Sequence, residues 1–319
     1  MHRWRRIYSF DYMGHKKWWF TISAVIIVAG LASLFIRGGG NPVDGLTYGL
    51  EFKTGTRLIV VFDEQADVGA VRDAVTSAGF PGAVVQQIKT TGAGSKFQVQ
   101  TDVLSPEQSQ RLQDALDKDF SLATDANGKF AVEVQTVSPA FGKQVISASW
   151  KAALVAILLI LGYITLRFEW KFAIGAIAAE FHDLLIVVGV YSITGREVTT
   201  ATIAAVLTIL GYSLYDTVIV YDRIRENAPK LGRVAYGDIV NRSIWETLTR
   251  SINTTVLVLL PVLCLLFFGG GTLKDFAFAL LVGIISGAYS SIFVASPVLT
   301  ILKERESRYR KLAAARTQS

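Results

Sequence analysis

The sequence predicts a polytopic α-helical membrane protein with one sizeable soluble domain between its first and second membrane helices. Three observations predict this class. Of the 319 residues, 51% are hydrophobic, and the mean hydropathy is positive. The apolar residues gather into six segments, each close to the roughly 20 residues that a helix needs to cross a bilayer. Only one long polar stretch, residues 38–143, separates two of these segments.

The six apolar segments predict six transmembrane helices with both termini on the same side of the membrane. Residues 1–17 hold five Lys/Arg against Asp11 alone, and residues 303–319 hold six against two glutamates. Basic flanks of this kind are typical of the cytoplasmic side. We therefore expect cytoplasmic ends at 1–17 and 303–319, the first helix within 18–37, and the other five within 146–302. The segments are Trp18–Ile36, Ile146–Leu166, Phe172–Ile193, Val198–Tyr221, Ile252–Phe268 and Phe276–Leu302.

Residues 38–143 predict a soluble domain on the outer side of the membrane. Their charge differs from that of the flanks, with nine Lys/Arg against thirteen Asp/Glu. Runs rich in β-branched residues predict strands at 56–62, 83–89, 96–100 and 130–137. Helical periodicity predicts helices at 67–78 and 105–119, the second opening with an N-cap serine and a proline. The β-α-β-β-α-β order predicts a ferredoxin-like domain.

One further helix is expected in the cytoplasmic loop 222–250. Residues 236–248 have apolar side chains at helical spacing, which predicts a helix lying along the inner membrane face. In the last span, Gly283 and Gly287 form a pair of small residues four apart, which favours close packing of two helices, either within the chain or with a partner subunit.

The sequence offers no sign of an enzyme, a metal site or a cofactor site. Cys264 is the only cysteine, so neither an intramolecular disulfide nor a cysteine cluster for zinc is expected. The glycine triplets at 38–40 and 269–271 lack the following Lys-Ser/Thr of a phosphate-binding loop and more simply end helices. The formal charge of +6 gathers at the termini, which is typical of cytoplasmic flanks beside membrane lipid and not of a nucleic-acid-binding surface.

Asp216 is the main candidate functional residue because it lies inside the apolar segment Val198–Tyr221. A carboxylate in a membrane helix costs about 2.5–3.5 kcal/mol on insertion scales, and such residues usually mark ion or proton paths. Asp216 lies six residues before Asp222, or roughly 9 Å of helix rise. The sequence therefore predicts a proton site at Asp216, with a partner charge on a neighbouring helix.

Arg250 is the expected partner, because it lies at the inner end of the next span and at comparable depth. Thr247, Arg250 and Thr254 occupy one stripe of that helix, with Ser251 and Thr255 beside them. Facing polar stripes on the two helices would hold water and relay a proton. The alternative is a structural ion pair that only fixes helix packing.

Asp183 is the third candidate, in a polar group near the centre of the third span. Glu180 and Asp183 are three residues apart and share a helix face, whereas His182 is expected to point elsewhere. One interpretation gives Asp183 a second place in the proton path. The other interpretation is a protonated or hydrogen-bonded acid with a structural role.

The segment Gly211–Asn227, GYSLYDTVIVYDRIREN, resembles the fourth-span signature of the SecF family of bacterial protein-export membrane proteins. That family usually reads Gly-Tyr-Ser-x-Asn-Asp-Thr/Ser, followed by Asp-Arg-Ile-Arg-Glu-Asn. Asp216 matches the family's intramembrane aspartate, and Tyr215 replaces its usual asparagine.

Four more segments carry the same resemblance across nearly the whole chain. In the segment after the first span, Glu51 stands where the family has aspartate and Thr56 where it has glycine. The fifth-span match places Arg250 on the family's functional arginine. The matching segments are Gly45–Thr56, Arg167–Trp170, His182-Asp183 and Glu246–Thr255.

The resemblance implies a function beyond what the spacing gives. The SecF family is similar to half of a resistance-nodulation-division transporter, and its members pair with SecD, which supplies six further helices. The pair associates with the SecYEG channel, often with YidC, and uses the proton-motive force to promote export of unfolded polypeptide. Asp216 would bind the proton, Arg250 would modulate it, and Asp183 would support the path.

Two other functions remain open at this point. A stand-alone small-molecule exporter of the resistance-nodulation-division type would need two six-helix repeats in one chain, and this chain has one. A purely structural assembly subunit would use the outer domain to bind partners, and its buried charges would only pack.

Overall fold

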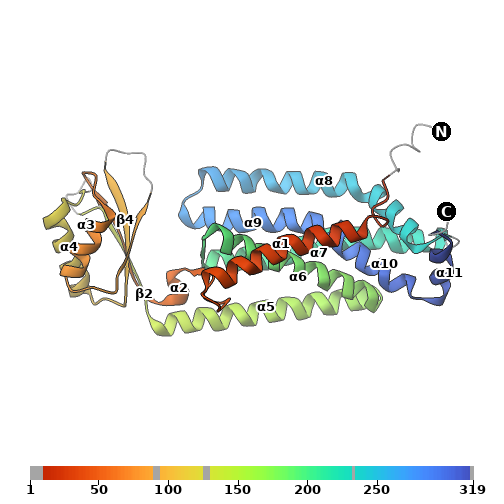
Figure 1. The fold of residues 1–319 in the computed structure, drawn as a ribbon, viewed down its shortest axis with the longest axis horizontal. Helices are drawn as coiled ribbons and strands as arrows, with labels where there is room; N and C mark the ends of the chain where they lie inside the picture. Colours follow the sequence, from red (N-terminus) through yellow and green to blue (C-terminus); the bar gives the residue numbers. More distant parts are fainter. Residues whose placement is uncertain (1–9, 89–93, 125–129, 232–233, 317–319) are drawn as a thin grey trace. The chain divides into compact units, whose positions relative to one another are not determined.

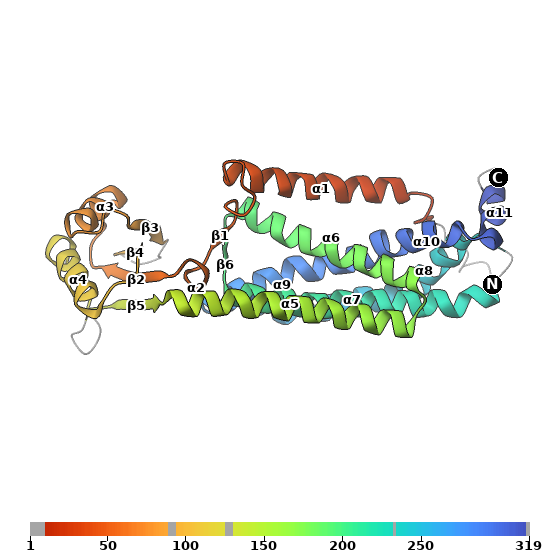
Figure 2. The same ribbon diagram turned by 90° about the horizontal axis from the view of Figure 1, so that it is seen from below.

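The computed structural model describes residues 10–88, 94–124, 130–231 and 234–316. The chain divides into two compact units. One is a helical unit formed by residues 1–47 and 149–319, and the other is a smaller unit formed by Tyr48–Ala148. Figures 1 and 2 show long helices lying side by side in the first unit and a small sheet with two helices in the second.

In the described chain, 6 helices are long and apolar enough to cross a membrane, which confirms the expected number. The sixth is continuous through three segments, because a π-helical turn at Ser291–Ala295 joins α9 to α10. A short helix, α11 (Ser307–Arg316), follows. The six are α1 (Lys16–Arg37), α5 (Pro139–Arg167), α6 (Trp170–Thr194), α7 (Thr200–Lys230), α8 (Tyr236–Phe268) and α9–α10 (Gly271–Glu304).

The expectation of a separate helix on the inner membrane face is wrong, because residues 236–248 are the first turns of α8. No glycine or proline interrupts residues 238–260, so nothing in this stretch ends the helix. The apolar residues that suggested a membrane face, Tyr236, Ile239 and Val240 among them, are buried in one core cluster with residues of α7. The helical periodicity is real, but protein covers the apolar side.

Small residues allow the helices of this unit to approach closely. A side chain added at Gly283 or Gly287 of α9 would collide with Ile209 or Ser213 of α7. The packing expected from the glycine spacing is therefore made within the chain. α9 also packs against α6 and α8, and α1 packs against α6. Between α6 and α7, the strand β6 (Glu197–Val198) pairs with β1 (Thr47–Tyr48).

The smaller unit is an antiparallel four-stranded sheet with two helices on one face. The strands lie in the order β3-β4-β2-β5, and the chain runs β2-α3-β3-β4-α4-β5. Leu58 pairs with Val99 and Val60 with Phe97, so these four side chains share one face and pack with both helices. The elements are α2 (Leu50–Lys53), β2 (Gly55–Phe62), α3 (Val68–Ser77), β3 (Val84–Ile88), β4 (Ser95–Thr101), α4 (Pro106–Phe120) and β5 (Val132–Val137).

Two of the three departures from the family pattern, Glu51 and Thr56, fall in α2 and at the start of β2. Local contacts explain the threonine at position 56. Its hydroxyl accepts a hydrogen bond from the Leu104 backbone at 2.9 Å and lies 3.0 Å from the hydroxyl of Thr136. Gly55, just before it, has φ +131°, a conformation that favours glycine. Lys89, the last residue of the expected strand 83–89, lies outside the described residues.

The cap of α4 provides a first prediction. Ser105 accepts a hydrogen bond from the backbone of Gln108, whose side chain bonds back to the Ser105 backbone. Ser105→Ala is expected to cost about 1 kcal/mol of local stability, because it removes half of this capping box. Hydrogen exchange of the α4 amides in the full chain measures the change. Ser77→Ala, at an exposed position of α3, is the control, and equal exchange in both variants would contradict the prediction.

Candidate functional site

Asp216 lies on α7 with 1% of its surface exposed, in an unusual polar environment. Neither carboxylate oxygen has a hydrogen-bond partner among the described residues. Three more hydroxyl groups, from Tyr212 on α7 and from Ser251 and Thr255 on α8, are also buried and have no hydrogen-bond partner among the described residues. We call the contact between α7 and α8 that holds these groups the seam. Buried polar atoms are normally hydrogen-bonded, so such a group of exceptions needs an explanation.

Arg250 lies near Asp216, but the structure does not pair the two. Its guanidinium donates a hydrogen bond to the Tyr215 hydroxyl at 3.0 Å. On α8, Ser251 and Arg250 both lie in the neighbourhood of the Asp216 carboxylate. Tyr215, which replaces the asparagine of the family signature, thus takes the hydrogen bond of the Arg250 guanidinium in this structure.

Asp183 is fully hydrogen-bonded, in contrast to Asp216. Three serine hydroxyls donate to its carboxylate, from Ser213 on α7 at 2.7 Å and from Ser286 and Ser290 on α9 at 2.6 and 2.8 Å. The carboxylate therefore joins three helices. The sequence did not predict these serines as partners of Asp183, because they lie 30 to 107 positions away in the chain.

His182 does not simply point away from Asp183, as the helical spacing suggested. Its Nδ1 lies 3.1 Å from Asp183 Oδ1, and its Nε2 lies 3.1 Å from the hydroxyl of Ser23 on α1. Ser23 in turn donates to Tyr289, whose hydroxyl donates to a backbone carbonyl of α1. Glu180 is buried with one unbonded carboxylate oxygen. Polar contacts thus connect α1 to the Asp183 cluster.

The two acids are suited to different tasks. Asp183 is held by many partners and fixes the packing of α6, α7 and α9. Asp216 has polar neighbours and a nearby positive charge but no fixed partner, which is the arrangement that a proton-exchanging group needs. Within the described residues, no group of three or more His, Cys, Asp or Glu side chains could hold a metal ion.

This fold and site define a polytopic helical membrane protein with a buried acid inside a membrane-spanning helix, and this acid has no hydrogen-bond partner among the described residues. The family model for "Protein export membrane protein SecD/SecF, C-terminal" matches residues 119–305. The chain belongs to the SecD/SecF family.

Individual relatives extend the similarity to nearly the whole chain. The protein translocase subunit SecF of Streptomyces coelicolor is 36% identical over 312 residues, which cover 95% of this chain and 79% of that protein. SecF of Rhodothermus marinus is 36% identical over 97% of this chain and 98% of its own length. The crystal structure of SecDF from Thermus thermophilus, a translocon-associated membrane protein, superposes with a TM-score of 0.79 and 36% identity. The match covers 93% of this chain and 39% of SecDF.

Proposed function

We propose that this chain is a SecF-type subunit that promotes protein translocation together with a SecD partner. The names of the relatives support this role, and the SecDF relative joins both names in one longer chain. The proposed cargo is an unfolded polypeptide passing through SecYEG, with YidC as a further partner in the same lipid bilayer. The proposed location is the bacterial inner membrane, with cytoplasmic ends at 1–17 and 303–319.

Residues 38–143, which hold most of the smaller unit, are proposed to form a ferredoxin-like periplasmic domain. Its β-α-β-β-α-β order and the strand order β3-β4-β2-β5 support that assignment. The membrane helices occupy 18–37 and 146–302 in this proposal, and the loop 222–250 faces the cytoplasm. The smaller unit would then act at the side where the exported chain emerges.

The energy source in this proposal is the proton-motive force, and Asp216 is the residue that takes up the proton. The observation that carries the proposal is a buried carboxylate without a hydrogen-bond partner among the described residues, beside Arg250 on the next helix. A charge that crosses 100 mV gains about 2.3 kcal/mol, enough to bias two arrangements of a helix bundle. Arg250 would approach and leave Asp216 during the cycle, and Asp183 would support the path.

Asp216→Asn tests this proposal, because asparagine keeps the size of the side chain and cannot carry the proton. We expect the part of translocation that depends on a proton gradient to be lost, while translocation without the gradient is unchanged. The measurement is export into membrane vesicles with and without an imposed gradient. Asp222→Asn is the control: that acid is exposed on the same helix and pairs with Arg167. A wild-type response to the gradient in Asp216→Asn would show that the assignment is wrong.

The two other functions give different results in related tests. A small-molecule exporter would not copurify with SecD-like and channel subunits. A purely structural subunit would still support export when Asp216→Asn is combined with Arg250→Leu, because neither charge would carry a coupling step.

A further inference from the structure

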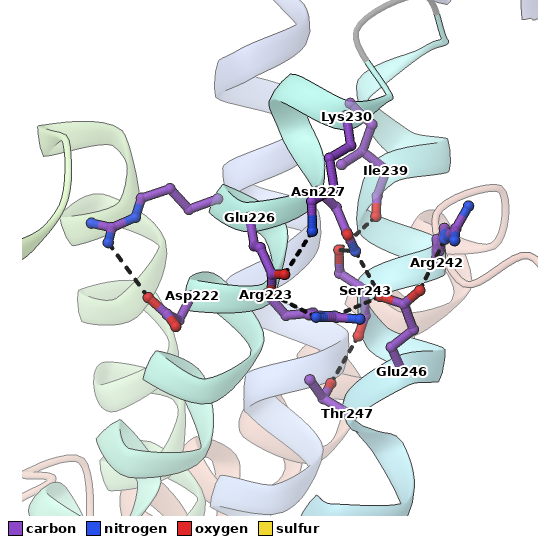
Figure 3. A network of polar contacts seen from close by, with 11 residues as sticks. Asp222, Arg223, Glu226, Asn227, Lys230, Ile239, Arg242, Ser243, Glu246 and Thr247 are labelled. Atoms are coloured by element: carbon purple, nitrogen blue, oxygen red, sulfur yellow. Dashed lines mark hydrogen bonds and ion pairs between the residues drawn. The ribbon is translucent and has the colours of Figure 1, made fainter.

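The seam between α7 and α8 changes character along its length. At the level of Asp216 several buried polar atoms, those of Asp216, Tyr212, Ser251 and Thr255, have no hydrogen-bond partner in the described structure. Toward the α7–α8 connection, hydrogen bonds join the two helices. Figure 3 shows this second part, which we call the Glu246 network. The Glu246 carboxylate on α8 accepts hydrogen bonds from Arg223 at 2.6 Å, Asn227 at 2.8 Å and Arg242 at 2.9 Å.

Two of these three bonds cross from one helix to the other. Arg223 and Asn227 belong to α7, whereas Arg242 belongs to α8 together with Glu246. Asn227 also donates to the hydroxyl of Ser243 at 3.0 Å, so its amide bridges the two helices twice. Charge-assisted bonds of this kind are stronger than bonds between neutral groups.

The centre of the network, at Glu246 and Asn227, is shielded from solvent, whereas its arginines reach the surface, with 36% of the Arg223 and 57% of the Arg242 side chain exposed. Only 15% of the Glu246 side chain and 4% of Asn227 are exposed, and Ser243 is fully buried. Exposed ion pairs contribute little because water and salt screen them, whereas removing one partner of a buried pair is costly. The Glu246 network therefore holds the two helices at a fixed separation.

The network lies on the same seam as the proposed proton site. Arg223 follows Asp216 by seven positions, which places both on one stripe of α7, and Glu246 precedes Arg250 by one helical turn on α8. Thr247, which is buried, lies between Glu246 and Arg250 along α8, and Ser251, also buried, directly follows Arg250. A proton that leaves Asp216 along the seam toward the α7–α8 connection meets the Glu246 network next.

We propose that Glu246 is a positioning residue that closes this end of the seam by holding α7 against α8. In this proposal the Glu246 network blocks access to Asp216 from the α7–α8 connection. Breaking the bonds of the network is the step that lets the Asp216 carboxyl exchange a proton with that side. This inference rests on the proposed function of Asp216. The competing interpretation is that the network only stabilises the α7–α8 hairpin and does not control access to Asp216.

The rate at which a thiol reagent labels a cysteine placed beside Asp216 separates these interpretations. Ser251→Cys, in a Cys264→Ala background, puts a thiol at a buried position beside Asp216. Inside-out membrane vesicles expose the proposed cytoplasmic side to a hydrophilic thiol reagent. We expect slow labelling with Glu246 intact and at least tenfold faster labelling when Glu246→Ala is added.

Glu226→Ala is the matched control. Glu226 bonds to Arg223 and Lys230, and all three belong to α7, so this change removes an acid from the same neighbourhood without removing a bond between helices. Its labelling rate should equal that of the parent. Equal rates in Glu246→Ala and Glu226→Ala would overturn the inference.

A second variant covers the case in which Glu246→Ala does not fold. Arg223→Gln removes one bond across the seam and leaves Asn227 in place, so a smaller increase in labelling is expected, and no increase would also overturn the inference. The labelling does not require Asp216 to carry a proton. A wild-type gradient response in Asp216→Asn would therefore refute the proposed function without deciding whether the Glu246 network blocks access.

Discussion

Asp183→Leu is expected to cause the largest loss of stability of any polar substitution that we propose. The carboxylate accepts hydrogen bonds from Ser213, Ser286 and Ser290 and lies beside His182, so leucine would leave three buried hydroxyls without their acceptor. Each unsatisfied buried group costs about 1–3 kcal/mol in soluble proteins. Even at about 0.6 kcal/mol per bond, the average between membrane helices, four bonds amount to roughly 2 kcal/mol.

Thermal unfolding in detergent, followed by loss of the monodisperse peak in size-exclusion chromatography, measures this effect. Asp183→Asn is the matched variant, because its amide oxygen still accepts hydrogen bonds, and it should fall between the wild type and Asp183→Leu. Gradient-driven export of Asp183→Asn then shows whether Asp183 also serves the proton path. Unchanged unfolding of Asp183→Leu would mean that the carboxylate does not hold the three helices together.

The number of membrane helices and the candidate acids could be predicted because both signals are local. Long apolar runs mark helices whatever surrounds them, and a lone carboxylate such as Asp216 is conspicuous inside one. The helical periodicity of residues 236–248 was also a local signal, but what covers that face is a tertiary property. The structure covers it with residues of α7, so the expected membrane contact was wrong.

The partners of each acid could not be predicted, since they are set by the packing of distant segments. Ser286 and Ser290 lie more than 100 positions after Asp183, and no periodicity within one helix links them to it. Arg250 was found from the hairpin geometry, yet its bond to Tyr215 depends on side-chain orientation. The Glu246 network was missed for a related reason: charged residues near a helix end usually indicate a solvated surface, and only the structure shows that the Glu246 side chain is largely shielded there.

Gly189→Leu is expected to displace α1 from α6 and so to cause a large packing defect in the helical unit. The two helices meet at Gly30 and Gly189, where a Cβ built on Gly30 would lie 2.7 Å from the Gly189 Cα, and one on Gly189 would lie 2.9 Å from the Gly30 Cα. Backbone atoms cannot move aside as a flexible side chain can. Overpacking costs about 1–3 kcal/mol and occasionally more, and we expect the upper end here.

The loss should extend to the polar contacts that depend on this approach. Ser33 lies 2.8 Å from the Ser192 hydroxyl, Arg37 donates to the Ser192 carbonyl at 2.6 Å, and Ser23 contacts His182. Thermal unfolding in detergent compares Gly189→Leu with Gly162→Leu, a control in another membrane helix, α5, where an added Cβ has no neighbour within 4 Å among the described atoms. The control should unfold at or slightly above the wild-type temperature, since leucine favours a helix more than glycine does. Similar unfolding of the two variants would show that contact between Gly30 and Gly189 does not set the position of α1, and that its polar contacts with α6 suffice.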